Sequence, residues 1–275
     1  MDWVLVAAVF AVLLLQGGIG AWRWWLILRR QGNAPAFATV LRLFFIGMFF
    51  NQTLSTTVGG DAARVMLLRA RGQGGGAAIS GIVLERAAGL LALIALIPAA
   101  LLLAPGAAAR TALAALAIAA VGLVALTMLG PRLRDARWRR FAAAGRFLAE
   151  ARAILLTPAG LPILALSLAI HMGGGLAVYG LVRASGAAVD LWVCLTLAPP
   201  VLLVATLPVS FGGWGVREAA LIGLLAPFGI AAESALGISV ALGLLVMAAG
   251  LPGGVLWLMP RMRRRPERRL FRENI

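Results

Sequence analysis

The chain has 275 residues, of which 62% are apolar and only 13% are charged. A soluble domain is about half apolar and a quarter charged, so this composition excludes a water-soluble enzyme, and it is too apolar for a disordered chain. The net charge of +15 comes from arginine alone, and no segment is long enough to form a basic nucleic-acid-binding domain. The length allows about six to nine membrane-spanning helices.

Long apolar runs rich in Ala, Leu and Gly predict an all-α polytopic membrane protein, because a membrane β-barrel would show short alternating segments. The N-terminus carries Asp2 and no basic region, so we do not expect a cleaved signal peptide. In chain order the runs are 3–28, 34–58, 77–104, 111–129, 161–182, 187–207, 216–226 and 231–259.

The charge pattern predicts that two segments enter the membrane and return to the same side. Arg29 and Arg30 follow the first run, and the positive-inside rule places them in the cytoplasm, with the N-terminus outside. If the second run crossed completely, the basic loop 131–158 would fall outside, against that rule. The conflict disappears if 34–76 enters from the cytoplasm and turns back, and if 187–230 does the same from the outside. Non-helical backbone at that depth requires surrounding protein or a wet cavity.

The segment 131–158 carries seven arginines, with apolar residues near helical spacing. This pattern predicts an amphipathic helix on the cytoplasmic leaflet, which is either a plain connector or a contact for anionic lipid. The tail 261–275 carries seven more arginines and is expected in the cytoplasm. We therefore divide the chain into four parts. Residues 1–130 form a first membrane repeat plus an extra helix, and residues 131–158 form the cytoplasmic connector. Residues 159–260 form a second, inverted membrane repeat, and residues 261–275 form the basic tail.

Two similar motifs recur at a constant offset of 153 residues (53 to 206, 64 to 217). Thr53-Leu54, Gly59-Gly60 and Arg64 in the first half correspond to Thr206-Leu207, Gly212-Gly213 and Arg217 in the second. The positive-inside rule gives the two copies opposite orientations, which predicts an inverted-topology repeat with two re-entrant segments broken at the Gly-Gly pairs. In transporters of this architecture, paired interrupted helices mark the substrate site.

In each copy a Gly-Gly pair precedes a short helical stretch. A helix N-terminus presents unpaired N–H groups and a positive dipole end, which favour an anion. Arg64 and Arg217 follow about one turn later, and their planar guanidinium groups suit phosphate oxygens. The alternative is that the glycines only permit helix–helix contact and that the arginines pair with acidic residues.

Several other polar residues lie along the same segments. Glu85 and Arg86 interrupt an apolar run, where charges must be paired, so they form either a structural pair crossed with Asp61 or Arg64 or part of the transport route. Glu218 is placed to orient its neighbour Arg217 or to exchange partners with it. The full set of candidate substrate-binding residues is Asn51, Thr53, Gly59, Gly60, Asp61, Arg64, Glu85, Arg86, Gly212, Gly213, Arg217 and Glu218.

The sequence offers little support for catalysis, since it contains no recognisable nucleophile or metal-ligand motif. The single cysteine, Cys194, lies in an apolar run and is expected to pack, and the single histidine, His171, is expected to be a hydrogen-bonded helix residue. We expect no metal, no cofactor and no enzymatic activity.

The order Asn51, Gly59-Gly60-Asp61, Arg64, Glu85-Arg86 and Gly212-Gly213-Trp214-Gly215-Val216-Arg217-Glu218 resembles the transmembrane family of lysylphosphatidylglycerol synthase/flippase proteins. The resemblance covers about residues 5–260. It implies a multi-pass protein of a bacterial or archaeal cytoplasmic membrane that moves lipids between leaflets or partners lipid-modifying enzymes. Bifunctional members carry an aminoacyl-transferase domain after the membrane part, and this chain ends at Ile275, so we expect no synthase activity.

The leading hypothesis is therefore a flippase that moves an anionic, phosphate-bearing lipid across the inner membrane. The alternatives are a non-transporting membrane subunit that presents lipid to a partner enzyme, and a membrane-embedded lipid-phosphate enzyme. The expected partners are membrane lipids with anionic head groups and, in the second hypothesis, a lipid-modifying enzyme.

Overall fold

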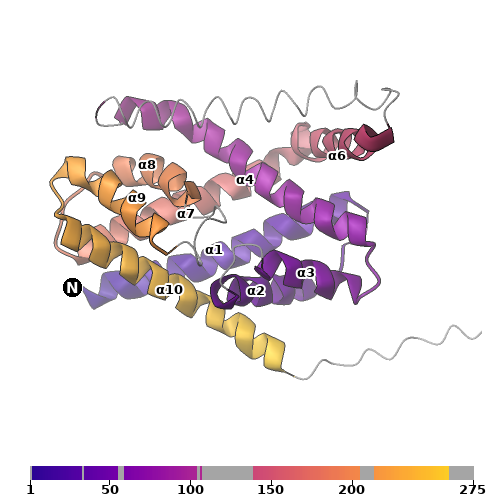
Figure 1. Cartoon of the computed structure of the whole chain (residues 1–275), viewed down its shortest axis with the longest axis horizontal. Helices are drawn as coiled ribbons and strands as arrows, with labels where there is room; N and C mark the ends of the chain where they lie inside the picture. The colour runs from indigo at the N-terminus through magenta and orange to yellow at the C-terminus, as the bar shows by residue number, and fades with distance from the viewer. Residues whose placement is uncertain are drawn as a thin grey trace, which may run out of the picture.

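The computed structural model describes residues 2–32, 34–54, 59–103, 106, 139–204 and 214–259. Within these ranges the regular structure is helical and contains no strand, as predicted. The long helices run along the length of the molecule (Figure 1). The elements are α1 (Trp3–Arg30), α2 (Phe37–Thr53), α3 (Gly59–Arg69), α4 (Gly75–Leu103), α6 (Arg139–Leu155), α7 (Leu161–Ala184), α8 (Leu191–Val204), α9 (Val216–Leu225) and α10 (Ala232–Leu258), with short 3-10 turns η1 (Pro158–Gly160) and η3 (Ala226–Phe228).

Four of the described helical segments are long and apolar enough to cross a membrane: Trp3–Arg30, Gly75–Pro98, Pro158–Ala184 and Ala232–Leu258. Large apolar side chains such as Leu15, Leu244 and Leu251 are exposed on these helices, as expected for surfaces that face lipid. The protein is therefore a multi-pass membrane protein. The predicted run 111–129 and the tail 261–275 lie outside the described residues.

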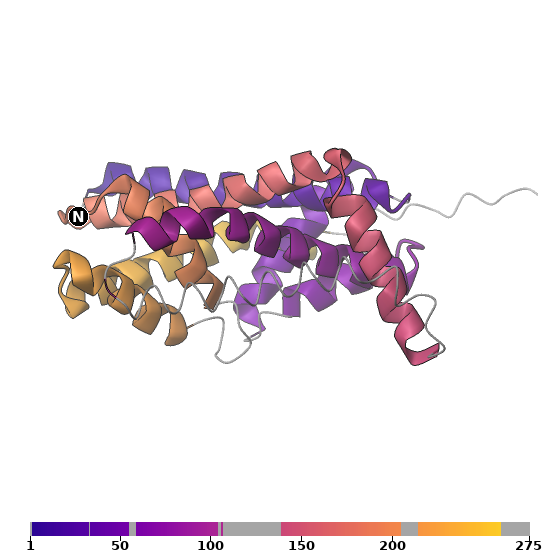
Figure 2. The same ribbon diagram turned by 90° about the horizontal axis from the view of Figure 1, so that it is seen from above.

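The helices α1 and α7 form a long antiparallel pair. At one end the backbone N–H of Asp2 donates to the carbonyl of Ala184 at 3.0 Å, and at the other end Arg30 donates to the carbonyl of Ala159. Between them, Gln16 donates to the carbonyl of Ile170 at 2.6 Å. We call the end that contains Arg30 the α6 end, because α6 lies across it (Figure 2).

The helices α2 and α3 form a tight antiparallel hairpin. The backbone N–H of Gly60 donates to Oδ1 of Asn51 at 2.9 Å, and a Cβ atom on Gly60 would collide with the carbonyl oxygen of Gly47. With 17 residues, α2 is only about 25 Å long, which is shorter than the hydrocarbon core of about 30 Å. The hairpin therefore starts and ends at the α6 end without reaching the opposite one (Figure 1).

The position of the hairpin tip follows from the contact of α2 with α10. Gly253 of α10 packs against the carbonyl of Phe45, and Gly250 packs against the backbone of Phe49, so the two helices run antiparallel. Arg42 extends this contact by donating to the carbonyl of Leu256 at 2.6 Å. The last residues of α2 consequently lie beside the middle of α10.

The helices α8 and α9 occupy the other half of the molecule (Figure 1). Gly175 of α7 packs directly on the backbone of Cys194 and Leu195 near the start of α8. At the start of α9, the guanidinium of Arg217 lies against Gly243, near the middle of α10. The succession of a long helix, two short helices and a long helix in α1–α4 thus occurs again in α7–α10.

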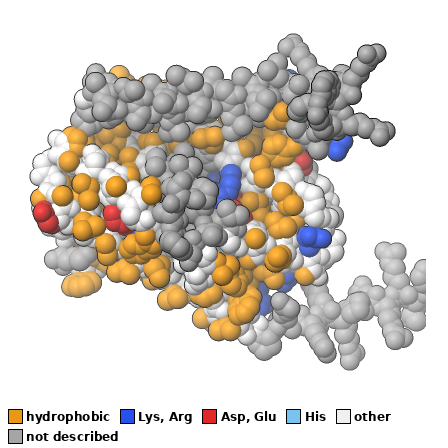
Figure 3. Space-filling view, in the orientation of Figure 1, with side chains coloured by type: hydrophobic (Ala, Val, Ile, Leu, Met, Phe, Trp, Pro, Cys, Tyr) orange, Lys and Arg blue, Asp and Glu red, His pale blue; other side chains and the backbone are white. Residues whose placement is uncertain are grey.

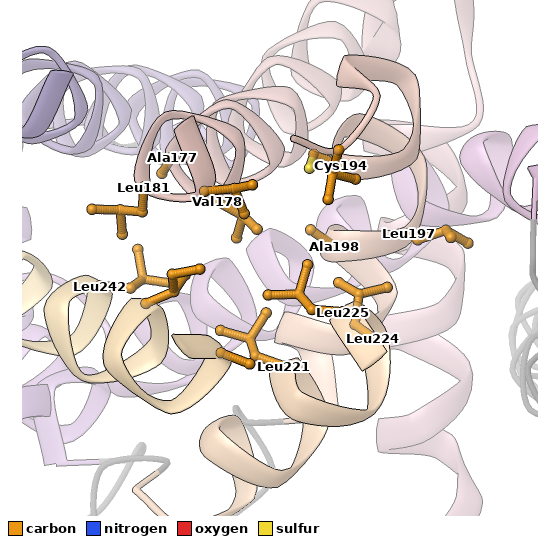
Figure 4. Packing of buried hydrophobic residues seen from close by; sticks show 14 of the residues in the cluster. Ala177, Val178, Leu181, Cys194, Leu197, Ala198, Leu221, Leu224, Leu225 and Leu242 are labelled. Atoms are coloured by element: carbon orange, nitrogen blue, oxygen red, sulfur yellow. The ribbon is translucent and has the colours of Figure 1, made fainter. Parts of the chain in front are cut away.

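Buried apolar side chains of α7, α8, α9 and α10 meet in a large core cluster (Figure 4). Leu181, Leu221 and Leu225 are fully enclosed there. Cys194 belongs to this cluster, which confirms that it packs. A smaller cluster around Trp24, Leu43 and Leu68 holds α1, α2 and α3 together. The two halves are therefore each packed around apolar side chains, and α1 and α4 contribute side chains to both clusters.

The helix α6 is amphipathic, as the helical spacing of its apolar residues predicts, although residues 131–138 lie outside the described part of the connector. Its buried face, formed by Leu148, Ala151, Ile154 and Leu155, packs with side chains of α1, α4 and α7. Glu150 accepts hydrogen bonds from Gln31 at 2.9 Å and Ser80 at 2.6 Å. The apolar face of α6 thus covers protein, while Arg146 and Arg152 are exposed.

Candidate functional site

Two buried arginines share one buried carboxylate in the first half of the bundle. Nη2 of Arg23 lies 2.8 Å from Oε1 of Glu85, and Nη1 of Arg64 lies 2.7 Å from Oε2 of the same side chain. The exposed fractions of the three side chains are 11%, 8% and 6%. Each oxygen of Glu85 therefore binds a different helix, and the carboxylate joins α4 to α1 and α3.

Asp61 extends this cluster to Arg86. Nη2 of Arg64 lies 2.5 Å from Oδ1 of Asp61, while Nε of Arg86 donates to Oδ2 at 3.0 Å and its Nη2 pairs with the same oxygen. The pairs are crossed, because the neighbours Glu85 and Arg86 bind different partners, as the sequence suggested. Arg86 differs from the other members in that half of its side chain is exposed. We call Arg23, Asp61, Arg64, Glu85 and Arg86 the first charged cluster.

Aromatic and hydroxyl groups hold the arginines of the first charged cluster in place. The guanidinium of Arg64 lies 4.8 Å from the ring of Trp24 and 5.0 Å from that of Phe44, at distances that allow cation–π attraction. Nη1 of Arg23 donates to Oγ of Ser167 at 3.0 Å. Thus α1, α2 and α7 all contribute side chains that fix these charges.

A second charged cluster lies at the start of α9. Nη2 of Arg217 lies 2.9 Å from Oε1 of Glu218, and Ser239 joins both by accepting from Arg217 at 3.3 Å and donating to Glu218 at 3.1 Å. The other oxygen of Glu218 accepts the backbone N–H of Gly215, whose φ of +81° favours glycine. Trp214 stacks 4.6 Å from the Arg217 guanidinium. Glu218 therefore both caps α9 and orients Arg217.

The structure brings some predicted site residues together and separates others. Asp61, Arg64, Glu85 and Arg86 meet in the first charged cluster, and Arg217 meets Glu218 in the second. Two other members of the predicted set make local contacts: Asn51 accepts the backbone N–H of Gly60, and Thr53 donates to the carbonyl of Phe49 at 3.1 Å. Gly59 begins α3, and Gly212 and Gly213 lie outside the described residues. Gly60 serves the close approach of α2 and α3, which is the structural role that the sequence left open.

Arg23 of the first charged cluster, and several residues that contact the two clusters, were missing from the predicted set. Arg23 is a charge late in an apolar run, which signals that it needs a partner, but the sequence does not indicate which one. Ser167 and Ser239 carry no signal, because isolated serines are common in membrane helices. The sequence also does not single out Gly47 and Gly243, because their role is to make room for another helix or for the side chain of Arg217. These contacts depend on helix packing alone.

Outside the charged clusters, the titratable residues offer little chemistry. Among the described residues, no group of three or more His, Cys, Asp or Glu side chains could hold a metal ion. His171 is hydrogen-bonded as predicted, with Nε2 2.8 Å from the carbonyl oxygen of Gly89. What the arrangement offers is a set of fixed charges, buried between membrane-spanning helices, that can bind or orient a charged group.

Comparison with known proteins identifies the family. The family model described as "Lysylphosphatidylglycerol synthase TM region" matches residues 1–254, which include both charged clusters. No curated protein and no solved structure matched the chain. Because the match covers nearly the whole sequence, the chain belongs to the family of the lysylphosphatidylglycerol synthase transmembrane region.

Proposed function

We propose that this protein is a lipid flippase, which moves an anionic, phosphate-bearing lipid between the leaflets of a bacterial or archaeal cytoplasmic membrane. The observation that carries the proposal is a pair of buried charged clusters at half-membrane helices inside the bundle. Charges at that depth are costly, and they usually mark a substrate pathway. A hairpin that turns back inside the bundle places the polar groups of its turn along such a pathway. A helix that crossed the membrane completely would have these polar groups at the membrane surface.

The proposal includes an inverted-topology repeat, in which α1–α4 correspond to α7–α10. Three observations support it: the helices follow in the same order of lengths, the first helices of the two sets run antiparallel, and Arg64 and Arg217 each lie in the second short helix. The packing also corresponds, since α2 contacts α10 just as α8 contacts α4. Inverted repeats bind substrate where their broken helices meet, near the bilayer midplane.

The orientation that we propose places the α6 end in the cytoplasm and the N-terminus outside. Exposed arginines gather at the α6 end, namely Arg29, Arg30, Arg69, Arg71, Arg146 and Arg152. Near the opposite end lie Asp2, Asp190, Glu233 and Arg183. On the face shown in Figure 3, acidic side chains lie toward the left end, and arginines lie near the middle and toward the right, with small acidic patches beside them. The positive-inside rule assigns the arginine-rich end to the cytoplasm.

In this proposal the head group passes the α2–α3 hairpin and the helices α8 and α9, and the charged clusters guide it. Arg64 and Arg217 are each already paired with a carboxylate of this chain, so they fix the geometry of α3 and α9 as well as attracting an anion. It stays a prediction that Arg64 and Arg217 clamp one phosphate and that the other predicted site residues bind the substrate.

A leaflet-exchange assay tests transport. The purified protein is reconstituted in vesicles that contain a fluorescent phosphatidylglycerol, and a membrane-impermeant reductant bleaches the outer leaflet. In a flippase, bleaching continues to completion, whereas protein-free vesicles retain their inner half. Arg217→Gln removes a charged hydrogen bond and should slow exchange about tenfold or more. The exposed Arg183→Gln, at the outer end of α7, should exchange at the wild-type rate.

The second candidate function is a membrane subunit that presents lipid to a partner enzyme. The docked helix α6, with exposed arginines at one end of the bundle, favours this alternative, because it is a basic surface on which a partner could assemble. Lipid binding without exchange in the same vesicles would support the presenting subunit and refute the flippase.

A further inference from the structure

The two charged clusters differ in where the arginine of each short helix finds its carboxylate. Arg64 of α3 pairs with Glu85 of α4 at 2.7 Å, and a second ion pair joins the same two helices. Arg217 of α9, in contrast, pairs at 2.9 Å with Glu218, its neighbour in the same helix. Ion pairs therefore tie α3 to α4, whereas none joins α9 to another helix among the residues that the structure describes.

This difference lies at corresponding places of the proposed repeat. With the offset of 153 residues (64 to 217, 86 to 239), Ser239 of α10 takes the place of Arg86 in α4. Arg64 binds Glu85, directly before Arg86, and Arg217 donates to Ser239 at 3.3 Å. Both arginines thus reach the same turn of the long helix that follows them, but the second finds a hydroxyl group there and not a carboxylate.

The helix α9 can leave α10 without separating any of these charges. The hydrogen bonds that join the second charged cluster to α10 both involve Ser239, which accepts from Arg217 and donates to Glu218 at 3.1 Å. When they break, Arg217 and Glu218 stay paired and move together as a neutral unit. Separation of α3 from α4 would instead pull opposite charges apart at low dielectric constant, which is far more costly.

The other contacts of α9 are ones that a membrane protein can exchange. Leu221 and Leu225 pack in the core cluster with side chains of α7, α8 and α10 (Figure 4). Lipid tails are as apolar as leucine, so they can replace such contacts when a helix moves. The guanidinium of Arg217 lies on the bare backbone at Gly243, where a Cβ atom would overlap Nη2, so no side chain at that position retains it.

We propose that α9 is the helix that moves away from α10 during transport, with the paired Arg217 and Glu218, while the first charged cluster keeps α3 fixed on α4. The inference rests on the proposed function, because it names the moving element of the flippase. The last residues of α9 connect through η3 to the start of α10, so in the proposed orientation α9 lies toward the outside. Its movement therefore opens the bundle toward the outer leaflet.

Distances between spin labels, measured by pulsed electron–electron double resonance on the full chain in phosphatidylglycerol nanodiscs, test this movement. In a Cys194→Ala background, one pair joins Leu15→Cys on α1 to Gly223→Cys on α9, and the other joins Leu15→Cys to Met66→Cys on α3. The three labelled positions are exposed. We expect two populations of distances for the α9 pair and one population for the α3 pair.

Relocation of the carboxylate from α9 to α10 tests the cause. In the double variant Glu218→Gln with Ser239→Asp, Arg217 keeps one carboxylate, now on the other helix, and the net charge is unchanged. The amide oxygen of the glutamine can still accept the N–H of Gly215. The α9 pair should collapse to one distance, and leaflet exchange should slow about tenfold or more, because the helices are now joined by a charged hydrogen bond.

Ser239→Ala should have the opposite effect. It removes the hydroxyl group that joins α9 to α10, so the ratio of the second α9 population to the first should rise about fivefold. Gly237→Ala, at an exposed position in the same helix with nothing within 4 Å of the added methyl group, is the matched control and should keep the wild-type ratio.

The results that overturn the inference are a single α9 distance in both the wild type and Ser239→Ala, a second population for the α3 pair, or two α9 populations that persist in the double variant. If the double variant fails to fold, Ser239→Ala decides, because an unchanged ratio overturns the inference by itself. Two α9 populations without leaflet exchange would refute the flippase and support the movement. Exchange with one α9 distance in every variant would support the flippase and overturn the inference.

Discussion

Glu85 is the residue on which the first charged cluster depends most directly. It binds Arg23 and Arg64, which approach it from two other helices, and only 5% of it is exposed. Taking such charges out of water costs several kcal/mol per ion, and their mutual attraction offsets this cost only while every partner is present. Each member of the cluster is therefore stabilising only in the presence of the others.

Glu85→Gln is expected to destabilise the protein strongly, since it leaves the buried Arg23 without its carboxylate partner and Arg64 with Asp61 alone. Removing one partner of a buried ion pair costs about 3–5 kcal/mol. The midpoint of thermal unfolding of the purified protein in detergent should fall accordingly. Glu233→Gln, at an exposed position in the first turn of α10, is the matched control and should leave the midpoint nearly unchanged. Equal midpoints for both variants would show that the cluster is not a buried ionic network.

At the scale of helices, small residues determine how closely α2 approaches its neighbours. A Cβ atom on Gly253 would overlap the carbonyl oxygen of Phe45, and one on Gly60 would overlap that of Gly47. In a membrane, helices associate through such close backbone contact, because lipid tails remove the hydrophobic driving force between them. The hairpin α2–α3 is therefore held between α10 and α4 by glycine contacts and by the first charged cluster.

Gly253→Ala should consequently weaken the contact between α2 and α10. The backbone must shift to admit the methyl group, and overpacking of this kind costs about 1–3 kcal/mol. Gly237→Ala in the same helix meets nothing within 4 Å and should be neutral or slightly stabilising, because alanine favours helix more than glycine does. The comparison is made by thermal unfolding of the two variants. A Gly253→Ala midpoint at or above that of Gly237→Ala would contradict the close contact.

At the scale of the whole molecule, the charges at its two ends predict how it sits in the membrane. The α6 end should face the cytoplasm and the junction of α7 and α8 should face outward. In a Cys194→Ala background, we expect Ser185→Cys to react with a membrane-impermeant maleimide on intact cells. We expect Gly74→Cys, in the exposed turn after α3, to react only after permeabilisation. Labelling of position 74 on intact cells would reject both the re-entrant hairpin and the inverted repeat.

The sequence alone determined the membrane class, the helical architecture and the position of the first hairpin. Hydropathy and arginine distribution are summed over local windows of the chain, so they can be interpreted without knowing which helices touch. The Gly-Gly pair at 59–60 predicted the start of α3 to within two residues, because a change in backbone direction is a local property; in the structure the pair forms the first two residues of α3 and does not precede it. Four residues of the first charged cluster could likewise be named in advance, since charges in apolar runs require partners.

Only the tertiary structure decided which of those partners meet. Glu85 binds Arg23, 62 positions away, and Arg23 also reaches Ser167, 144 positions further along the chain. These pairings depend on the rotation and register of packed helices, which are fixed by contacts such as Gly60 against Gly47. The sequence contains every charge in the cluster, but their partners and the exposure of Arg86 follow from packing, because burial and distance are properties of several helices together.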